Sequence, residues 1–367
     1  MSLASALILL SSFAPSFQDV STGDELPRID LEKPRNHGGF FSFALAPGGK
    51  VAAGGTGVTT IRSEGEARSG GGEVVLWDTA SGELLKTLGS HDHTPTWLAW
   101  TPDGNRVVSL SRNDLEVRVW AVRSGDLKGT FRIEDPPAWN RPPALALDGT
   151  VLVVVGDRSI EIAGREVRVP GALTAHALPD GKAVWSVPMS HTNAFAVSPD
   201  GASVALLVRE LAWSEEEGEL VGRSLKRYIA LLDAKTGEET WRADIPGGFE
   251  RVAFTPRGDS LYGVGRRRLQ RFSIEDGSPL SDLIQIDRSG GMRTLAFESD
   301  GEGLLVVELL NGSMDLLDVE SGALERRVVF EMPAKLSKPA FSPGLDRAVG
   351  LVGFDPVVLD LRAWRGQ

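Results

Sequence analysis

Residues 90–127 have the sequence SHDHTPTWLAWTPDGNRVVSLSRNDLEVRVWAVRSGDL. The turn Thr-Pro-Asp-Gly at 101–104 separates two apolar stretches, and Ser-Gly at 124–125 follows a third. Proline presets φ for a turn, and Asp and Gly tolerate the backbone conformations that follow, so this pattern predicts strands joined by tight turns. The apolar stretches are rich in Val and Leu, as expected for strands that are buried on both faces.

The same pattern recurs along the chain. The apolar stretch with its Pro-Asp-Gly-like turn returns at 43–49, 98–104, 145–149, 195–201, 252–259, 295–301 and 339–346. A strand, a Ser/Thr/Asp-Gly turn and another strand follow at 73–88, 117–131, 229–241, 269–280 and 314–328. Aligning the last residue before each second turn gives Asp78, Ala121, Gly164, Asp233, Ser273, Asp318 and Asp360. Most intervals in this series are close to the ~40–45 residues of a four-stranded propeller blade.

The repeat resembles the WD40-type, YVTN-like β-propeller family, and residues 90–127 are its best copy. Trp77-Asp78 is the one literal Trp-Asp pair, so the chain is a divergent member. The resemblance covers roughly residues 40–363. It implies a hydrogen-bonded tetrad that braces the blade, formed by His91, Asp114, Trp120 and the hydroxyl of Ser111, with Ser109 as the alternative.

The copies predict an all-β fold, a single seven-bladed β-propeller over residues 19–367. The last copy supplies three strands before the chain ends, and the family resemblance implies that the N-terminal stretch PRIDL at 27–31 closes that blade. An extra turn, LPDG at 178–181, lies too close to the turn at 198–201 for a full blade. We interpret it as an elaborated outer hairpin of blade three, and an eight-bladed ring is the alternative.

Residues 1–18 contain an apolar run that is too short to span a bilayer and has the length of a signal-peptide core. We therefore expect a cleaved signal peptide and an exported protein, periplasmic or extracellular, whose mature chain does not insert into a membrane. The composition gives a net charge of −11, which disfavours nucleic acid as a partner. The chain has no cysteine, which excludes disulfides, thiolate metal sites and cysteine nucleophiles.

Atypical loops predict a binding face. Insertions at 56–72 and 210–227 fall between second and third strands, and the unusual loops 90–95 and 134–143 connect blades. In a propeller these connections share one face, and binding residues concentrate on loops held by a rigid scaffold. We expect a protein or peptide partner for an otherwise monomeric chain, contacted by His93, Trp139, Asn140, Trp213, Glu215, Glu216 and Arg223.

Sequence motifs for catalysis are missing: the chain has no nucleophile elbow, P-loop, HExxH or dinucleotide fingerprint. His91 and His93 lack a visible third ligand, so we predict no metal and no cofactor. Residues 231–241, LLDAKTGEETW, resemble the tryptophan-docking motif of quinoprotein propellers, in which the tryptophan, here Trp241, packs neighbouring blades together. The prediction is a non-enzymatic scaffold, and the alternative is a lactonase-like or quinoprotein-like enzyme or ligand binder that uses the central channel.

Overall fold

The structure is a computed structural model. It describes residues 20–22, 26–34, 38–57, 61–63, 66–68, 71–137, 142–162, 164–189, 192–216, 219–286, 292–298, 301, 303–308, 313–330, 336–342 and 344–365.

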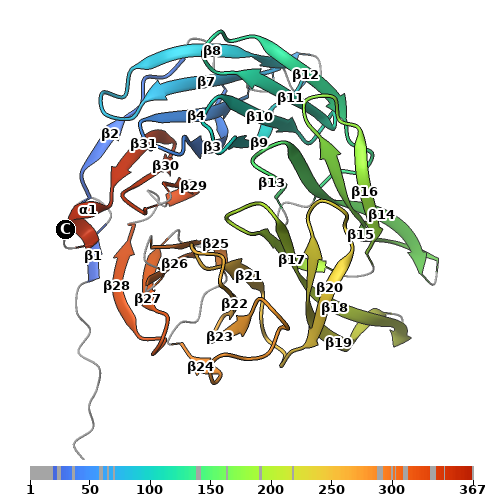
Figure 1. Ribbon diagram of the computed structural model, residues 1–367. Helices are drawn as coiled ribbons and strands as arrows, with labels where there is room; N and C mark the ends of the chain where they lie inside the picture. The colour runs from blue at the N-terminus through green and yellow to red at the C-terminus, as the bar shows by residue number, and fades with distance from the viewer. Residues whose placement is uncertain are drawn as a thin grey trace, which may run out of the picture.

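Seven sheets are arranged around a central axis, which makes the protein a seven-bladed β-propeller (Figure 1). Each blade is a sheet of four main strands, ordered from the innermost strand at the axis to the outermost strand at the rim. Blades one and two contain β3 (Phe40–Leu45), β4 (Val51–Thr56), β7 (Gly72–Asp78), β8 (Leu84–His91), and β9 (Pro95–Trp100), β10 (Arg106–Ser111), β11 (Glu116–Ala121), β12 (Leu127–Arg132). Blades three and four contain β13 (Ala144–Ala146), β14 (Val151–Ile162), β15 (Arg165–Ala177), β16 (Ala183–Pro188), and β17 (Thr192–Val197), β18 (Ser203–Glu216), β19 (Glu219–Asp233), β20 (Glu239–Asp244).

Blades five and six contain β21 (Arg251–Phe254), β22 (Ser260–Gly265), β23 (Arg268–Ser273), β24 (Ile284–Gln285), and β25 (Met292–Phe297), β26 (Gly303–Glu308), β27 (Met314–Asp318), β28 (Leu324–Val329). Blade seven contains β29 (Leu336–Phe341), β30 (Arg347–Val352) and β31 (Asp355–Asp360) from the C-terminal end. A short helix, α1 (Arg362–Arg365), follows, and no helix in the described part of the chain is long and apolar enough to cross a membrane.

The N-terminal segment closes the ring, as the sequence predicts. β2 (Arg28–Asp30) pairs antiparallel with β31 and becomes the outer strand of blade seven. The segment then binds blade one: Trp77 Nε1 donates a hydrogen bond of 2.7 Å to the carbonyl of Glu32. Leu31 is 3% exposed in a core shared by blades one and seven. β1 (Val20–Thr22) adds a parallel fifth strand to blade six, so the first described residues tie three consecutive blades together.

The alignment of Gly164 with the strand ends is wrong. Gly164 lies in the β14–β15 hairpin, and the equivalent residue of blade three is Ala177, the last residue of β15. The turn 178–181 is therefore the ordinary connection to β16, which leaves no room for an eighth blade. The irregular spacing has a simple cause, because blades three and four both lengthen their second and third strands.

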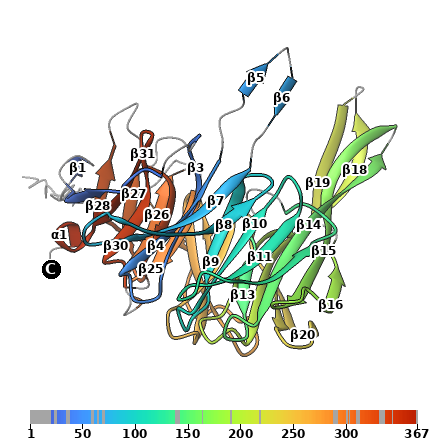
Figure 2. The same ribbon diagram turned by 90° about the horizontal axis from the view of Figure 1, so that it is seen from above.

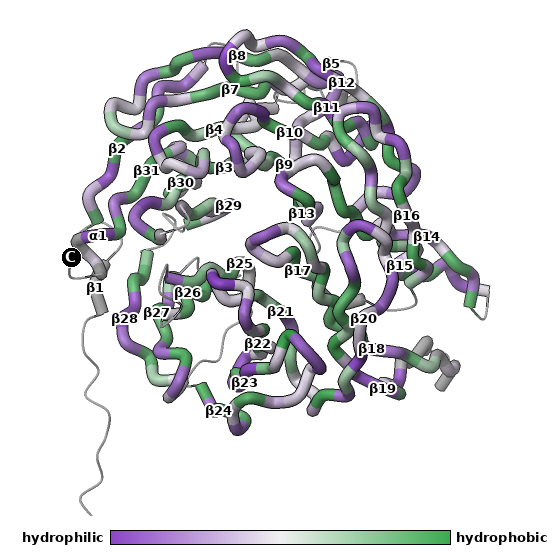
Figure 3. The backbone as a smooth tube through the Cα atoms, viewed as in Figure 1, coloured by the Kyte–Doolittle hydropathy of each residue, from purple (hydrophilic) through white to green (hydrophobic). Residues whose placement is uncertain are grey.

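The Asp that recurs at the ends of third strands stabilises the turn that follows it. Asp78 Oδ1 accepts hydrogen bonds of 2.8 Å from the backbone N–H of Ala80 and of Ser81, and Asp233 Oδ1 accepts the same pair from Lys235 and Thr236. A short carboxylate at this position satisfies the turn's free donors, which explains its repetition. Figure 3 shows that the hydrophobic stretches lie mainly within strands.

Aromatic side chains lock blades three, four and five to one another. Trp241 Nε1 donates to the carbonyl of Ile274 at 2.6 Å, and its ring lies against Gly277 of blade five. Trp185 does the same one blade earlier, donating to the carbonyl of Ala234 at 2.9 Å with its ring against Gly237. Trp241 is thus a packing residue, as its motif suggests, and Trp185 is a second copy of the same device.

Candidate functional site

Three hairpins rise from one side of the ring (Figure 2). They are β5 (Ile61–Ser63) with β6 (Glu66–Arg68) in blade one, and the outer parts of β14–β15 and β18–β19 in blades three and four. All three are connections between second and third strands, so they share a side with the loops that lead from blade to blade. We call this side the insertion face, and the opposite side, which carries the Pro-Asp-Gly turns, the turn face.

The long hairpins share a construction. In β14–β15 the register shifts between Gly156 and Asp157, which leaves Gly171 as the extra residue. In β18–β19 it shifts between Glu210 and Leu211, which leaves Leu225 as the extra residue. A β-bulge bends a hairpin and increases its twist, and in both blades it lies just beyond the last paired residue of the outer strand. Each hairpin is therefore a bent extension of the rigid ring.

The structure places most of the predicted binding residues on this face. Arg223 is exposed on β19, and His93 is half-buried in the loop between β8 and β9. Trp213, Glu215 and Glu216 lie on the outer part of β18, where the structure describes the backbone but not these side chains. Trp139 and Asn140 lie outside the described residues. The sequence reasoning missed the hairpin of blade three, although the alternating stretches SIEI and REVRV at 159–162 and 165–169 are the signal for it.

The tetrad in blade two is built around Ser109. Trp120 Nε1 donates to Ser109 Oγ at 2.8 Å, and His91 Nε2 lies 2.7 Å from the same oxygen. Ser111 was expected as the hydroxyl partner, and this is wrong: Ser111 Oγ is buried without a hydrogen-bond partner. Ser109 and Ser111 point to the same side of β10, so the pattern alone does not separate them. Trp120 pairs with Val107, which lies near the start of β10 and closer in sequence to Ser109 than to Ser111, so the indole reaches Ser109.

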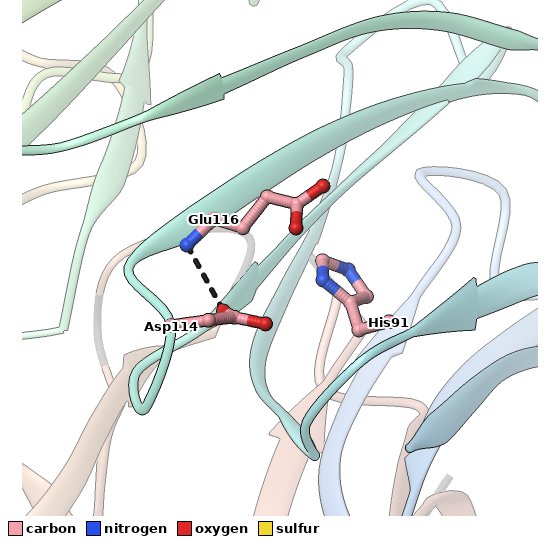
Figure 4. Close-up of side chains that lie close together, drawn as sticks. All are labelled: His91, Asp114 and Glu116. Carbon is pink, nitrogen blue, oxygen red and sulfur yellow. Dashed lines mark hydrogen bonds between the residues drawn. The ribbon is translucent and has the colours of Figure 1, made fainter.

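Two carboxylates lie beside the histidine, and Figure 4 shows His91, Asp114 and Glu116 facing one another. One ligand atom from each lies within 4.8 Å of the others. Glu116 Oε1 already accepts hydrogen bonds of 2.7 Å from Arg118 Nε and from Thr130 Oγ1. His91 Nδ1 and Asp114 Oδ2 are buried and lack partners, and a hydrogen bond between them would complete the tetrad. The cluster is thus explained as a structural brace.

The electrostatics of the cluster favour a neutral imidazole. Burial and, after it, the Arg118 guanidinium together lower the pKa of His91 to about 4, and the nearby carboxylates only partly oppose this. Burial alone would raise the pKa of Glu116, but hydrogen bonds from Arg118 and Thr130 hold it below its usual value. At neutral pH the cluster therefore holds a neutral His91 imidazole beside an ionised Glu116 carboxylate.

A cavity of about 600 Å³ lies along the inner strands of blades four to seven. Its lining is mostly apolar, with Phe195, Leu295 and Phe341 among its larger side chains. Thr294 and Ser342 contribute hydroxyls, and Arg251 is the only charged residue among the described ones that line it. Histidines and carboxylates that would convert such a cavity into a catalytic centre are missing from this lining.

Comparison with known proteins agrees with this architecture. Residues 169–328 match the profile of the family described as outer membrane protein assembly factor BamB, and they include both docking tryptophans. The chain is 32% identical over 65 residues to the retinoblastoma-binding protein 5 homolog of Drosophila melanogaster, covering 18% of the chain and 13% of that protein. It is 32% identical over 180 residues to centriole proteome protein 16 of Chlamydomonas reinhardtii, covering 44% of the chain and 8% of that protein.

Two solved structures have the same fold. The β-propeller domain of Cps50 (Swd1) from Myceliophteria thermophila superposes with a TM-score of 0.62 at 16% identity, covering 90% of the chain and 99% of that domain. Kuenenia stuttgartiensis hydrazine synthase gives a TM-score of 0.60 at 14% identity, covering 90% of the chain and 97% of the matched one. The chain is a divergent seven-bladed β-propeller with WD40-repeat proteins and a BamB-like profile among its similarities.

Proposed function

We propose that this divergent propeller is an exported, non-enzymatic scaffold that binds a protein or peptide through its insertion face. The observation that carries the proposal is that three hairpins project from that one face of the ring. A closed ring keeps its loops in fixed positions before a partner arrives, so little ordering entropy is lost on binding.

The lining of the channel supports a scaffold. A propeller hydrolase needs convergent histidines, arginines and carboxylates, whereas the described lining holds one arginine among apolar and hydroxyl side chains. The names of similar proteins, an assembly factor and a retinoblastoma-binding protein, are consistent with an interaction role. This support is by analogy of fold, because one fold hosts many functions.

Export is part of the proposal. Residues 3–14 form an apolar run of the kind found in signal peptides, and a chain without cysteine needs no oxidative folding step in either compartment. Fractionation of cells that produce the full chain tests this directly. Recovery of the protein in the periplasm or medium with a shortened N-terminus is expected, and an intact N-terminus in the cytosol would contradict it.

A small-ligand binder is the second candidate, because the cavity of about 600 Å³ falls in the size range of ligand pockets. Its lining suits an apolar ligand with an acidic group near Arg251. Replacing Ala253 by Phe would fill the cavity without touching the insertion face. Loss of small-molecule binding with full retention of partner capture would separate the two candidates.

Shortening the hairpins tests the scaffold proposal. One variant replaces residues 57–71 by Asn-Gly, which connects Thr56 to Gly72, and a second replaces residues 211–225 by Asn-Gly, after the pair Glu210–Lys226. Both should keep the wild-type unfolding midpoint and together should abolish capture of the partner from the native compartment. Glu275→Lys, on the turn face, is the matched control and should capture normally. Full capture by the doubly shortened protein would overturn the assignment of the face.

A further inference from the structure

Two arginines lie opposite each other at the insertion-face end of the seam between blades four and five. Leu207 of β18 and Ile229 of β19 belong to the core between these blades. Side chains alternate along a strand, so Arg209 and Arg227, each two residues further toward the hairpin, point to the same side of the sheet. β-pairing sets Arg209 directly opposite Arg227. In such a pair the Cβ atoms are about 5 Å apart, and like charges repel each other.

A third arginine, Arg268 of β23, reaches the same place from blade five. The loop that connects the two blades contains Gly247 and Gly248, and both glycines lie against guanidinium groups. A Cβ at Gly247 would collide with Nη1 of Arg227, and a Cβ at Gly248 would lie 3.1 Å from Cζ of Arg268. Arg268 Nη1 also donates a hydrogen bond to the carbonyl of Gly247. We call Arg209, Arg227 and Arg268 the arginine cluster.

The arginine cluster has no carboxylate partner among the described residues. At least seven other arginines in the described part of the chain form ion pairs with Asp or Glu. Within the cluster, Arg227 Nε donates to Ser224 Oγ at 3.2 Å, and Arg209 Nε is buried without a hydrogen-bond partner. A guanidinium has five N–H donors, so donors remain for a ligand. Three adjacent cations without an acid favour a ligand that supplies negative charge.

We propose that the arginine cluster binds the carboxylates of an acidic segment of the protein partner. This inference rests on the function proposed above and specifies the chemistry of the partner. The planar guanidinium group binds a carboxylate through two parallel hydrogen bonds. The three arginines come from two blades, so their charge extends across the seam and suits acidic side chains at successive positions of one peptide. A bound carboxylate would also relieve the repulsion between the two opposed arginines.

Apolar surface close to the cluster favours a peptide over a small inorganic anion. Leu225, two residues before Arg227 on β19, is 66% exposed. Pro246, which precedes the glycine pair of the loop, is exposed as well. Arginine is enriched in protein interfaces, where its apolar stem and its charged end both contribute. A peptide with acidic and apolar side chains would cover this surface, whereas a phosphate ion would use the charges alone.

Two matched peptides test the proposal on the purified full chain. The probe is an end-blocked hexapeptide with four glutamates and two leucines, and its control has glutamine in place of every glutamate. Fluorescence anisotropy of the labelled peptides should show that the wild type binds the acidic one, less tightly as salt is added, and not its control. An equal affinity for both peptides, or no binding of the acidic one, would overturn the proposal. Phosphate binding in place of peptide binding would overturn it too.

Substitutions locate the site. Arg227→Gln combined with Arg268→Gln should weaken peptide binding on the order of tenfold or more, because two charge-assisted contacts are lost. Arg123→Gln combined with Lys235→Gln makes the same change of charge at exposed residues of the turn face and should leave binding unchanged. Equal effects of the two variants would overturn the proposal. Urea unfolding midpoints are measured for both, and the comparison of the two peptides on the wild type requires no variant.

Partner capture separates this inference from the proposed function. The variant with Arg227→Gln and Arg268→Gln should lose most of the partner from the native compartment, whereas the turn-face variant should capture it normally. Normal capture by the first variant would overturn the acidic-segment proposal and leave the insertion face standing as the binding face. Full capture by the protein with both hairpins shortened would instead overturn the assignment of the face.

Discussion

Replacing Gly237 by alanine should weaken the contact between blades three and four. Gly237 has a φ of +74°, and a Cβ there would lie 2.6 Å from the Trp185 ring. The left-handed backbone costs an alanine roughly 1–2 kcal/mol. Forcing the indole aside costs about 1–3 kcal/mol more, since overpacking a close contact displaces its neighbours. We therefore expect a loss of about 2–5 kcal/mol in the free energy of unfolding.

A matched control isolates the docking contact. Gly104 has a φ of +69°, and a Cβ there would meet its nearest neighbour, in Pro47, at 3.9 Å. Gly104→Ala should therefore show the backbone cost alone. Urea unfolding at equilibrium measures both variants, and the difference between them is the clash with the indole.

A double-mutant cycle completes the test. Trp185→Ala removes the ring, so Gly237→Ala should cost no more in that background than Gly104→Ala does in the wild type. The coupling between Trp185 and Gly237 should be about 1–3 kcal/mol, as expected for residues in direct contact. Equal losses for the two glycine variants, or a coupling near zero, would refute the idea that this indole locks the blades.

Three further predictions concern the brace, the closure and a buried ion pair. The pKa of His91 is lowered to about 4, so the imidazole's contribution to the free energy of unfolding is complete above pH 6.5. That contribution falls by about 3 kcal/mol as the pH drops from 6.5 toward 4, because the unfolded chain takes up the proton first. His91→Gln should flatten this decline in urea titrations at pH 7 and 4.5, and an equally steep decline would exclude the histidine. Leu31→Ala, in the seam between the first and last blades, should lower the free energy of unfolding in urea by about 2–5 kcal/mol. Phe354→Ala, at a side chain 91% exposed, is the control and should cost under about 0.5 kcal/mol in the same assay. Arg327→Met should cost about 3–5 kcal/mol in urea unfolding because it removes the guanidinium that pairs with the fully buried carboxylate of Asp315, and Asp315→Asn should recover part of that loss in the same background.

The ring itself could be predicted from the sequence because its turns are chemically specific. Pro-Asp-Gly turns and terminal Asp residues recur at blade spacing, and the unpaired stretch at 27–31 required a place in an incomplete last blade. The turn signals are local, so they can be recognised in each blade even though the side chains between the turns differ from blade to blade. Counting strands showed that the last blade was incomplete, and the family resemblance implied the closure by an N-terminal strand that β2 confirms.

The misplacement of Gly164 shows where this reasoning fails. A glycine at the tip of a lengthened hairpin resembles a glycine at the end of a strand, and spacing alone assigned it to the blade repeat. The choice of Ser111 over Ser109 failed for a related reason, because both lie on one side of β10 and register decides between them. Contacts between blades, such as Trp185 with Gly237, join segments far apart along the chain, and no local pattern reveals them.

Site-specific crosslinking in the native compartment tests the central claim, that the insertion face binds the partner. Photoreactive residues would replace His93 or Arg223 on the insertion face, and Asp126 or Glu275 on the turn face. Mass spectrometry should identify the same partner from both insertion-face positions and from neither turn-face position. Crosslinks to a partner from the turn face, with none from the insertion face, would contradict the account.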